Sequence, residues 1–185
     1  MRIISGMARG RTFDAPKGMD TRPTLDRVRE NVFNILQLKV RDAKVLDLFS
    51  GSGGMAFEAI SRGAASAVLV DVDRAANALE KQNAVRLGMA EQCRILNIDW
   101  QLALRQFAAT GERFDLVFLD PPYKMHDMKP VLENLRPVLN TEAIILLEHE
   151  AKKFPSTPDG YYLYDSRKYG VAGVSFFRLN TTEEA

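Results

Sequence analysis

Short apolar runs of strand length alternate with longer segments of helical spacing, and this alternation limits the fold most strongly. The runs cover residues 43–49, 66–72, 93–98, 114–119 and 142–150. In the segment 74–88, Ala75, Leu79 and Leu87 share one face of a predicted helix, and Gly88 offers a C-cap. Nearly continuous apolar strands separated by helices indicate a mostly parallel sheet covered on both faces, with right-handed crossovers. The sequence therefore predicts a doubly wound α/β fold.

The two ends of the chain depart from this alternation. Residues 160–170 and 171–179 are two strand-like runs without a helix between them, which predicts an antiparallel hairpin at one edge of the sheet. Near the other end, a helix is expected after "RPT" (22–24), with one apolar face made by Leu25, Val28, Val32 and Leu36. The first 20 residues suggest a small basic hairpin or an extended arm. We divide the chain into a basic arm with its helix (1–41) and an α/β domain (42–185).

Length and composition suit one soluble domain. The chain has 185 residues, of which 46% are hydrophobic and 26% charged. No apolar run has the length of a signal-peptide core or of a membrane span, so a cytoplasmic location is expected. The single cysteine, Cys93, precedes an apolar run and is expected to be a small buried thiol, so no disulfide can form within the chain.

Charge is unevenly distributed. Residues 1–41 hold nine Lys and Arg against four acids, a formal charge of +5, while the whole chain carries +1. A basic segment on a mildly acidic body suits an enzyme that binds a polyanion, because Lys and Arg make most phosphate contacts. An ordinary solvated terminus is the alternative.

A glycine-rich stretch follows the first predicted strand. In "VLDLFSGSGG" the strand ends near Asp47 and continues into Gly51, Ser52, Gly53 and Gly54 at the start of a helix. Glycines there allow a tight turn and a close approach to a ligand at the carboxyl edge of the sheet. The match is weak alone, because "GSGGMA" also fits the dinucleotide pattern G-x-G-x-x-A, and a turn without a ligand stays open.

Acidic residues end the next two strands. Asp71 follows Gly51 by 20 residues and could accept hydrogen bonds from ribose hydroxyls. Asp99 could accept from an adenine amino group or cap the helix that follows, whereas Asp73 is expected to be an N-cap. Trp100 is expected in the core more than beside an adenine.

The fourth strand ends in "DPPY": Asp120, Pro121, Pro122 and Tyr123. Hydride transfer needs a proton-transfer group, usually His, but His126 and His149 have no catalytic setting in the sequence and are expected to be non-catalytic. The tetrapeptide suits methyl transfer to an amino nitrogen conjugated with a ring, because the carboxylate of Asp120 and the carbonyl of Pro121 could both accept from the amine. The prolines would hold these acceptors still, and Tyr123 would stack on the base. Such a tetrapeptide arises by chance in roughly one chain in a thousand, and a stiff turn is the alternative.

With these motifs the chain resembles the class I S-adenosylmethionine-dependent methyltransferases, and among them the bacterial 16S rRNA guanine-N2 methyltransferases. The similar segments are "MRIISGMARGR", "TRPTLDRVRENVFNIL", "LDLFSGSGG", "FLDPPY" and "RKYGVAGVSFFR". The resemblance implies a seven-stranded methyltransferase sheet whose last strand is antiparallel, S-adenosylmethionine as the cofactor, and a guanine of 16S rRNA as the substrate. Two departures are Asp71, where the family often has Glu, and Ser50, where it often has Ala.

The resemblance also implies roles for individual residues. Asp47, Gly51, Gly53, Asp71 and Asp99 would contact the cofactor, with Ser52 in the same loop, and Asp120 to Tyr123 would surround the amine. Arg22 and Thr24 would lie near the target nucleotide, and we expect Arg9 and Arg11 to contact RNA. The expected partner is 16S rRNA, in the small ribosomal subunit or an assembly intermediate. A monomer without metal or membrane contact is expected.

Three other functions stay open. A DNA adenine or cytosine amino-methyltransferase could use the same catalytic loop, although 185 residues leave little room for a domain that reads a DNA sequence. A nicotinamide dehydrogenase rests on "GSGGMA" alone, and a non-catalytic nucleic-acid-binding module rests on the basic arm alone.

Overall fold

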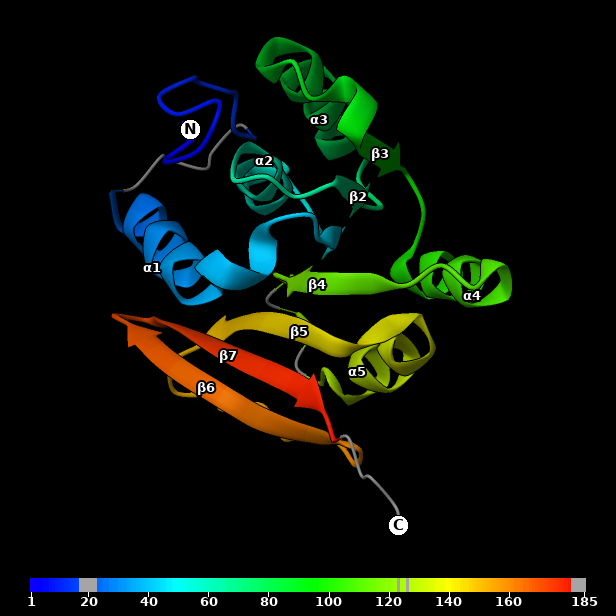
Figure 1. Ribbon diagram of the computed structural model, residues 1–185. Helices are drawn as coiled ribbons and strands as arrows, with labels where there is room; N and C mark the ends of the chain where they lie inside the picture. The colour runs from blue at the N-terminus through cyan, green and yellow to red at the C-terminus, as the bar shows by residue number, and fades with distance from the viewer. Residues whose placement is uncertain (17–22, 123, 126, 181–185) are drawn as a thin grey trace.

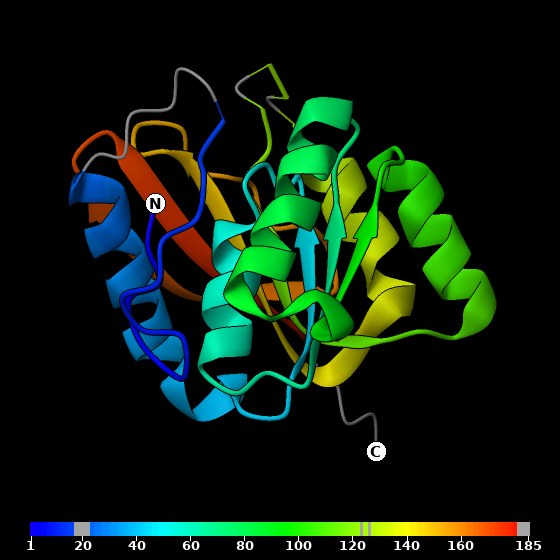
Figure 2. The same cartoon turned by 90° about the horizontal axis from the view of Figure 1, so that it is seen from above.

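A mostly parallel sheet forms the centre of the molecule (Figures 1 and 2). The computed structural model describes residues 1–16, 23–122, 124–125 and 127–180. In these residues seven strands form one sheet in the order β3-β2-β1-β4-β5-β7-β6. The strands are β1 Lys44–Leu48, β2 Ser66–Val70, β3 Cys93–Leu96, β4 Phe114–Leu119, β5 Leu139–Glu150, β6 Tyr161–Tyr169 and β7 Ala172–Leu179. Strands β1 to β5 pair in parallel, and β7 pairs antiparallel with both β5 and β6, so the predicted sheet and its closing hairpin are confirmed.

Helices cover both faces of the sheet. They are α1 Pro23–Val40, α2 Gly54–Ser61, α3 Arg74–Leu87, α4 Trp100–Thr110 and α5 Lys129–Leu135, with short 3-10 turns at Ala90–Gln92 and Arg136–Val138. Helices α1, α2 and α3 pack on one face, and α4 and α5 on the other (Figure 1). Along β4, Leu116 and Phe118 point to the first core while Val117 and Leu119 point to the second. Burial on both faces explains why the strands are nearly continuous apolar runs.

Helix α3 is placed as predicted, but its buried face differs. Asp73 caps it by accepting a hydrogen bond from the Ala75 backbone N–H at 2.8 Å, and Gly88 ends it at φ 72°. Ala75 is exposed, however. The buried positions are Ala76, Asn77, Glu80, Asn83, Ala84 and Leu87. The predicted face was wrong because three polar residues point inward. Glu80 accepts a hydrogen bond from Ser50 and Asn83 donates one to the Asp14 carbonyl, while the buried Nδ2 of Asn77 has no partner among the described residues.

The N-terminal segment packs against α2 and α3. An antiparallel bridge joins Arg2 to Thr12, so the predicted small hairpin is present, and Ile3, Ala8 and Phe13 lie in the same core as α2. The ring of Phe13 lies edge-on to that of Phe57, with centroids 5.8 Å apart. The boundary at residue 41 therefore divides the sequence but not the hydrophobic core.

Helix α1 starts two residues before its predicted start, and the described part of its predicted face is buried. It begins at Pro23, and Val28, Val32 and Leu36 are buried. The side chains of residues 23–25 lie outside the described residues, as does Arg22. Cys93 begins β3 and is only partly buried rather than buried, because β3 is the edge strand of this end of the sheet. Among the described residues, no helix is long and apolar enough to cross a membrane.

Candidate active site

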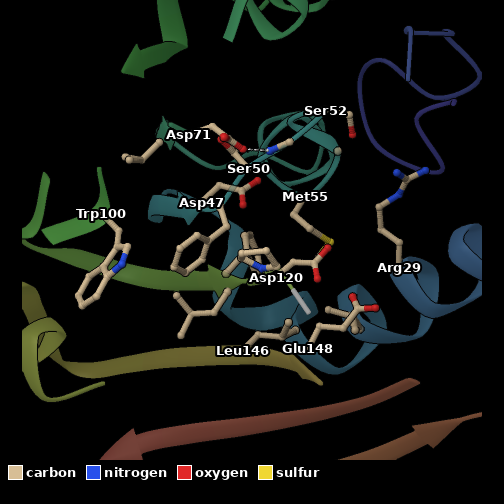
Figure 3. Close-up of a pocket in the computed structure, with 18 of the residues that line it drawn as sticks. Arg29, Asp47, Ser50, Ser52, Met55, Asp71, Trp100, Asp120, Leu146 and Glu148 are labelled. Carbon is tan, nitrogen blue, oxygen red and sulfur yellow. Dashed lines mark hydrogen bonds between the residues drawn. The ribbon is translucent and has the colours of Figure 1, made fainter. Parts of the chain in front are cut away.

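A cavity of about 430 Å³ opens at the carboxyl ends of β1, β2 and β4. Its wall includes most of the predicted cofactor and catalytic residues: Asp47, Gly51, Ser52, Asp71, Asp99, Asp120 and Pro122. Figure 3 shows several of them around the cavity. Open α/β sheets bind ligands at this edge, where the strand order reverses. The glycine loop and the "DPPY" loop, distant in sequence, therefore belong to one site.

The glycine loop turns through three residues with positive φ: Phe49 at 74°, Gly51 at 56° and Gly53 at 76°. A Cβ on Gly53 would lie 2.5 Å from the Phe57 ring and 2.8 Å from a methyl of Leu69. The Gly53 N–H donates to the Ser50 carbonyl at 2.8 Å. Gly53 thus lets the loop pack on the core, and Gly54, which the sequence analysis did not select, lines the cavity in its place.

Asp71 holds the loop in position. Its Oδ2 accepts from the Gly51 N–H at 2.9 Å, and its Oδ1 accepts from the Asp73 N–H at 2.8 Å. Each carboxylate oxygen can accept a further hydrogen bond, so contact with ribose hydroxyls stays a prediction that this geometry permits.

Asp99 has the alternative role named in the sequence analysis. It caps α4 by accepting from the Gln101 N–H at 2.8 Å, and it also lines the cavity beside Trp100. Trp100 is partly buried and packs against the core on the α4 side of the sheet. The same side chain also lines the cavity. The cap uses one carboxylate oxygen, and the contact with adenine stays a prediction.

Two buried acids lie below the loop. Asp47 is 3% exposed and accepts from the Ala56 N–H of α2 at 3.1 Å. Burial and the charge of Glu80 raise the pKa of Asp47 well above its usual value. Glu80, on α3, accepts from the Ser50 hydroxyl at 2.6 Å, and burial raises its pKa to about 7. An alanine at position 50 could not make this hydrogen bond to Glu80.

The catalytic side of the cavity holds a second pair of acids. Phe118 of β4 pairs in register with Leu146 of β5, and Leu119 pairs with Leu147, so Asp120, which directly follows β4, lies beside Glu148 of β5 on the same face. Figure 3 shows their carboxylates on the same side of the cavity. Burial raises the pKa of Asp120 to about 6, and burial together with the Asp120 charge raises the pKa of Glu148 to about 7.

Glu148 was not among the residues predicted for the site. The available signal was its spacing: Leu146 and Glu148 are two residues apart, so a strand that buries Leu146 on one face directs Glu148 to the same face. Of the other catalytic residues, Pro122 lines the cavity, Pro121 lines a neighbouring one, and Tyr123 lies outside the described residues.

His149 is held by the sheet. Its Nε2 lies 2.9 Å from the Ser175 hydroxyl and its Nδ1 lies 2.8 Å from the Glu150 carbonyl. A Cβ on Gly173 would lie 2.4 Å from the imidazole, so the ring packs directly on β7. These contacts agree with the expected non-catalytic role, and His126 lies outside the described residues.

Arg29 is a second residue that the sequence analysis did not select. Its side chain is 5% exposed and lines the cavity from α1. It donates to the Arg2 carbonyl at 2.6 Å and to Asp26 Oδ1 at 3.0 Å, and its Nε lies 3.8 Å from Glu58 Oε2. No hydrogen-bond partner for this buried Nε is found among the described residues. One buried cation thus joins the arm, α1 and the cavity wall.

Of the predicted RNA-contacting residues, Arg9 and Arg11 are described, and neither lines the cavity. Arg9 and Arg11 are exposed on the arm, and Arg11 donates to the Leu87 carbonyl of α3 at 3.1 Å. Arg22 and the side chain of Thr24 lie outside the described residues. In the described part of the chain, no group of three or more His, Cys, Asp or Glu side chains is placed to hold a metal ion.

Comparisons with known proteins agree with the site. The family model described as "Conserved hypothetical protein 95" matches residues 1–178. The chain is 36% identical over 186 aligned positions to the ribosomal RNA small subunit methyltransferase D of Escherichia coli, covering 99% of this chain and 90% of the relative. It is 32% identical to the protein of the same name from Haemophilus influenzae, over 96% of this chain and 93% of the relative. The solved structure of yhhF from Escherichia coli superimposes with a TM-score of 0.85 at 32% identity and covers 97% of each chain. The chain therefore belongs to the Conserved hypothetical protein 95 family, together with the ribosomal RNA small subunit methyltransferases D.

Proposed function

We propose that the protein transfers a methyl group from S-adenosylmethionine to the exocyclic N2 amine of a guanine in 16S rRNA. The observation that carries this proposal is a single cavity that joins the glycine loop and Asp71 to the acidic end of β4 at Asp120. Family membership supports the same activity, because close relatives are named as small-subunit rRNA methyltransferases. It also speaks against a nicotinamide dehydrogenase and a non-catalytic binding module.

The cavity fits the cofactor by size and chemistry. Its volume of about 430 Å³ lies in the range of small-molecule sites. Phe49, Val70 and Ile98 supply apolar wall for an adenine, while Asp71 and Asp99 supply acceptors for ribose hydroxyls and the adenine amine. The bound cofactor would supply an electrophilic methyl group on a sulfonium.

The catalytic step would depend on Asp120. The N2 lone pair of guanine is delocalised into the ring, so an acceptor must draw on the amine protons while the lone pair is aimed at the methyl group. The ionised Asp120 carboxylate would orient the amine and accept its proton, and the Pro121 carbonyl would hold the second proton. The prolines fix this part of the backbone, so positioning would supply much of the rate enhancement. Stacking of Tyr123 on the base stays a prediction.

The substrate would be recognised outside the cavity as well as in it. An exocyclic amine cannot be reached in a stacked base, so the target guanine would be turned out of its stack. The exposed Arg9 and Arg11, with Arg22 and Thr24, would contact the RNA near the target nucleotide. We expect the enzyme to act as a cytoplasmic monomer on the small ribosomal subunit or on an assembly intermediate.

Mass spectrometry of 16S rRNA tests this function. A strain without this gene should lack one guanine methyl group, and purified protein with S-adenosylmethionine should restore it. Protein carrying Asp120→Asn is the matched control and should not restore it. Unchanged guanine methylation in the deletion strain would refute the proposal, and tight binding of NAD without binding of S-adenosylmethionine would do so independently.

A further inference from the structure

A second cavity adjoins the first on the far side of the catalytic loop. Its volume is about 670 Å³, and its wall includes the end of β5, residues 151–156 and the β6–β7 turn. Lys152, Lys153 and the half-exposed ring of Phe154 line it. Asp120, Pro122 and Glu148 line both cavities, so these three residues mark the passage between them. A base that enters from the second cavity would meet both carboxylates before it reaches the first.

The two carboxylates are placed to act together on one planar ligand. Asp120 directly follows β4 and Glu148 lies within the neighbouring parallel strand β5, one position beyond the Leu119–Leu147 pair, and adjacent strands lie about 4.8 Å apart. Their side chains point to the same face, where Leu146 and Phe118 form the floor of the cavity. Within the described residues, neither carboxylate accepts a hydrogen bond. The pair therefore presents two acceptors at strand spacing without protein donors of its own.

The Watson–Crick edge of guanine has the matching pattern. Its N1–H and its N2 amine are neighbouring donors on the same edge. In adenine and cytosine the ring nitrogen beside the amino group carries a lone pair and no hydrogen. A carboxylate facing that position would accept from guanine and repel the other two bases, and a buried polar group left without its partner discriminates strongly.

We propose that Glu148 accepts the N1–H of the target guanine while Asp120 accepts from the N2 amine, which makes Glu148 the residue that selects guanine. This inference rests on the proposed function and deepens it. A negative charge at N1–H would also increase the electron density of the ring and strengthen N2 as a nucleophile. Without a ligand, burial and the Asp120 charge raise the pKa of Glu148 to about 7. The N1–H of guanine would donate to the carboxylate and so favour its ionised form.

The experiment compares guanine with 2-aminopurine at the target position of an rRNA fragment. 2-Aminopurine keeps the exocyclic amine but has an unprotonated N1. For the wild-type protein, kcat/KM should be at least about 100-fold lower on 2-aminopurine than on guanine, because the Glu148 carboxylate then faces a lone pair. For Glu148→Gln the ratio should fall below about 10-fold, because the amide can donate to N1 as well as accept from N1–H.

Glu142→Gln is the matched control. Glu142 lies near the other end of β5 and its side chain is 70% exposed, so this variant should keep the wild-type ratio. S-adenosylhomocysteine affinity should stay within a few-fold in both variants. A ratio in Glu148→Gln equal to that of the wild type would overturn the inference. Equal wild-type turnover of the two bases would overturn it whether or not the variant folds. Loss of guanine methylation by the wild-type protein itself would instead refute the proposed function.

Discussion

Acidic side chains lie on both sides of the active-site cavity, but their hydrogen bonds differ. On the side of β1 and β2, the carboxylates of Asp47, Asp71 and Glu80 accept hydrogen bonds from backbone N–H groups or from Ser50. On the side of β4 and β5, Asp120 and Glu148 have no such donors in the described part of the chain. Burial raises the pKa of acids on both sides.

This contrast separates two uses of the acids around the cavity. Acids of the first set hold the glycine loop and the start of α2, so their hydrogen bonds are part of folding. Acids of the second set stay available to a ligand, and they remain costly to ionise until a ligand donates to them. Mutations of Glu80 and of its partner Ser50 should therefore act mainly on stability, and mutations of Asp120 and Glu148 mainly on turnover.

The largest effect should come from the catalytic side. Asp120→Ala should lower kcat by at least about 10³-fold, because the acceptor of the amine proton is lost. Affinity for S-adenosylmethionine, measured by calorimetry, should stay within a few-fold of the wild type. Unchanged turnover would remove Asp120 from the mechanism.

Substitutions in the glycine loop should lower the free energy of unfolding. Gly53→Ala should destabilise the fold by about 2–4 kcal/mol, because it adds strain at positive φ to a clash with Phe57 and Leu69. Gly51→Ala is the control: its φ is also positive, but a Cβ there meets nothing within 4 Å, so about 1–2 kcal/mol is expected. Denaturant unfolding measures both, and equal losses would contradict the packing role of Gly53.

A smaller effect is expected below the loop. Ser50→Ala removes the donor to Glu80 and should destabilise the protein by about 1–3 kcal/mol above pH 7, where the folded protein carries an ionised Glu80 that this hydroxyl stabilises. Near pH 5 the loss should shrink, because Glu80 is protonated in the folded protein. A loss independent of pH would show that this bond does not stabilise the charged carboxylate.

The pH dependence should distinguish turnover from stability. Turnover needs ionised Asp120, so kcat/KM should rise between pH 5 and 8 with an apparent pKa that belongs to the Asp120–Glu148 pair. Their folded pKa values, about 6 and about 7, exceed the ordinary values of 3.8 and 4.5. Their contribution to stability is therefore fully present below about pH 4 and is lost as the pH rises through 6 to 7.

Glu148→Gln tests the electrostatic link within the pair. Removal of its negative charge should move the midpoint of the kcat/KM profile to lower pH, because Asp120 then ionises more easily. A pH–rate series on the guanine substrate measures this shift. An unmoved midpoint would show that the two groups titrate independently.

The sequence predicted the parts of this site that local pattern controls. Strand ends placed Asp71 and Asp120 at the carboxyl edge, and the capping position of Asp73 followed from its place before a helix. Glu148 and Arg29 could not be found in this way. The position of Glu148 beside Asp120 depends on the register between β4 and β5, and Arg29 enters the cavity because α1 packs over β4. The buried face of α3 was predicted wrongly because Glu80 and Asn83 are buried polar residues, which interrupt the apolar period of the helix.

Arg29 has a thermodynamic consequence for the arm. The same guanidinium lines the cavity and donates to the Arg2 carbonyl. A bound group that attracts or repels this cation must therefore change the free energy with which the arm packs. By reciprocity, whatever displaces the arm must change the affinity of the cavity for that group by the same factor. The arm and the cavity are in this sense coupled binding surfaces that share one cation.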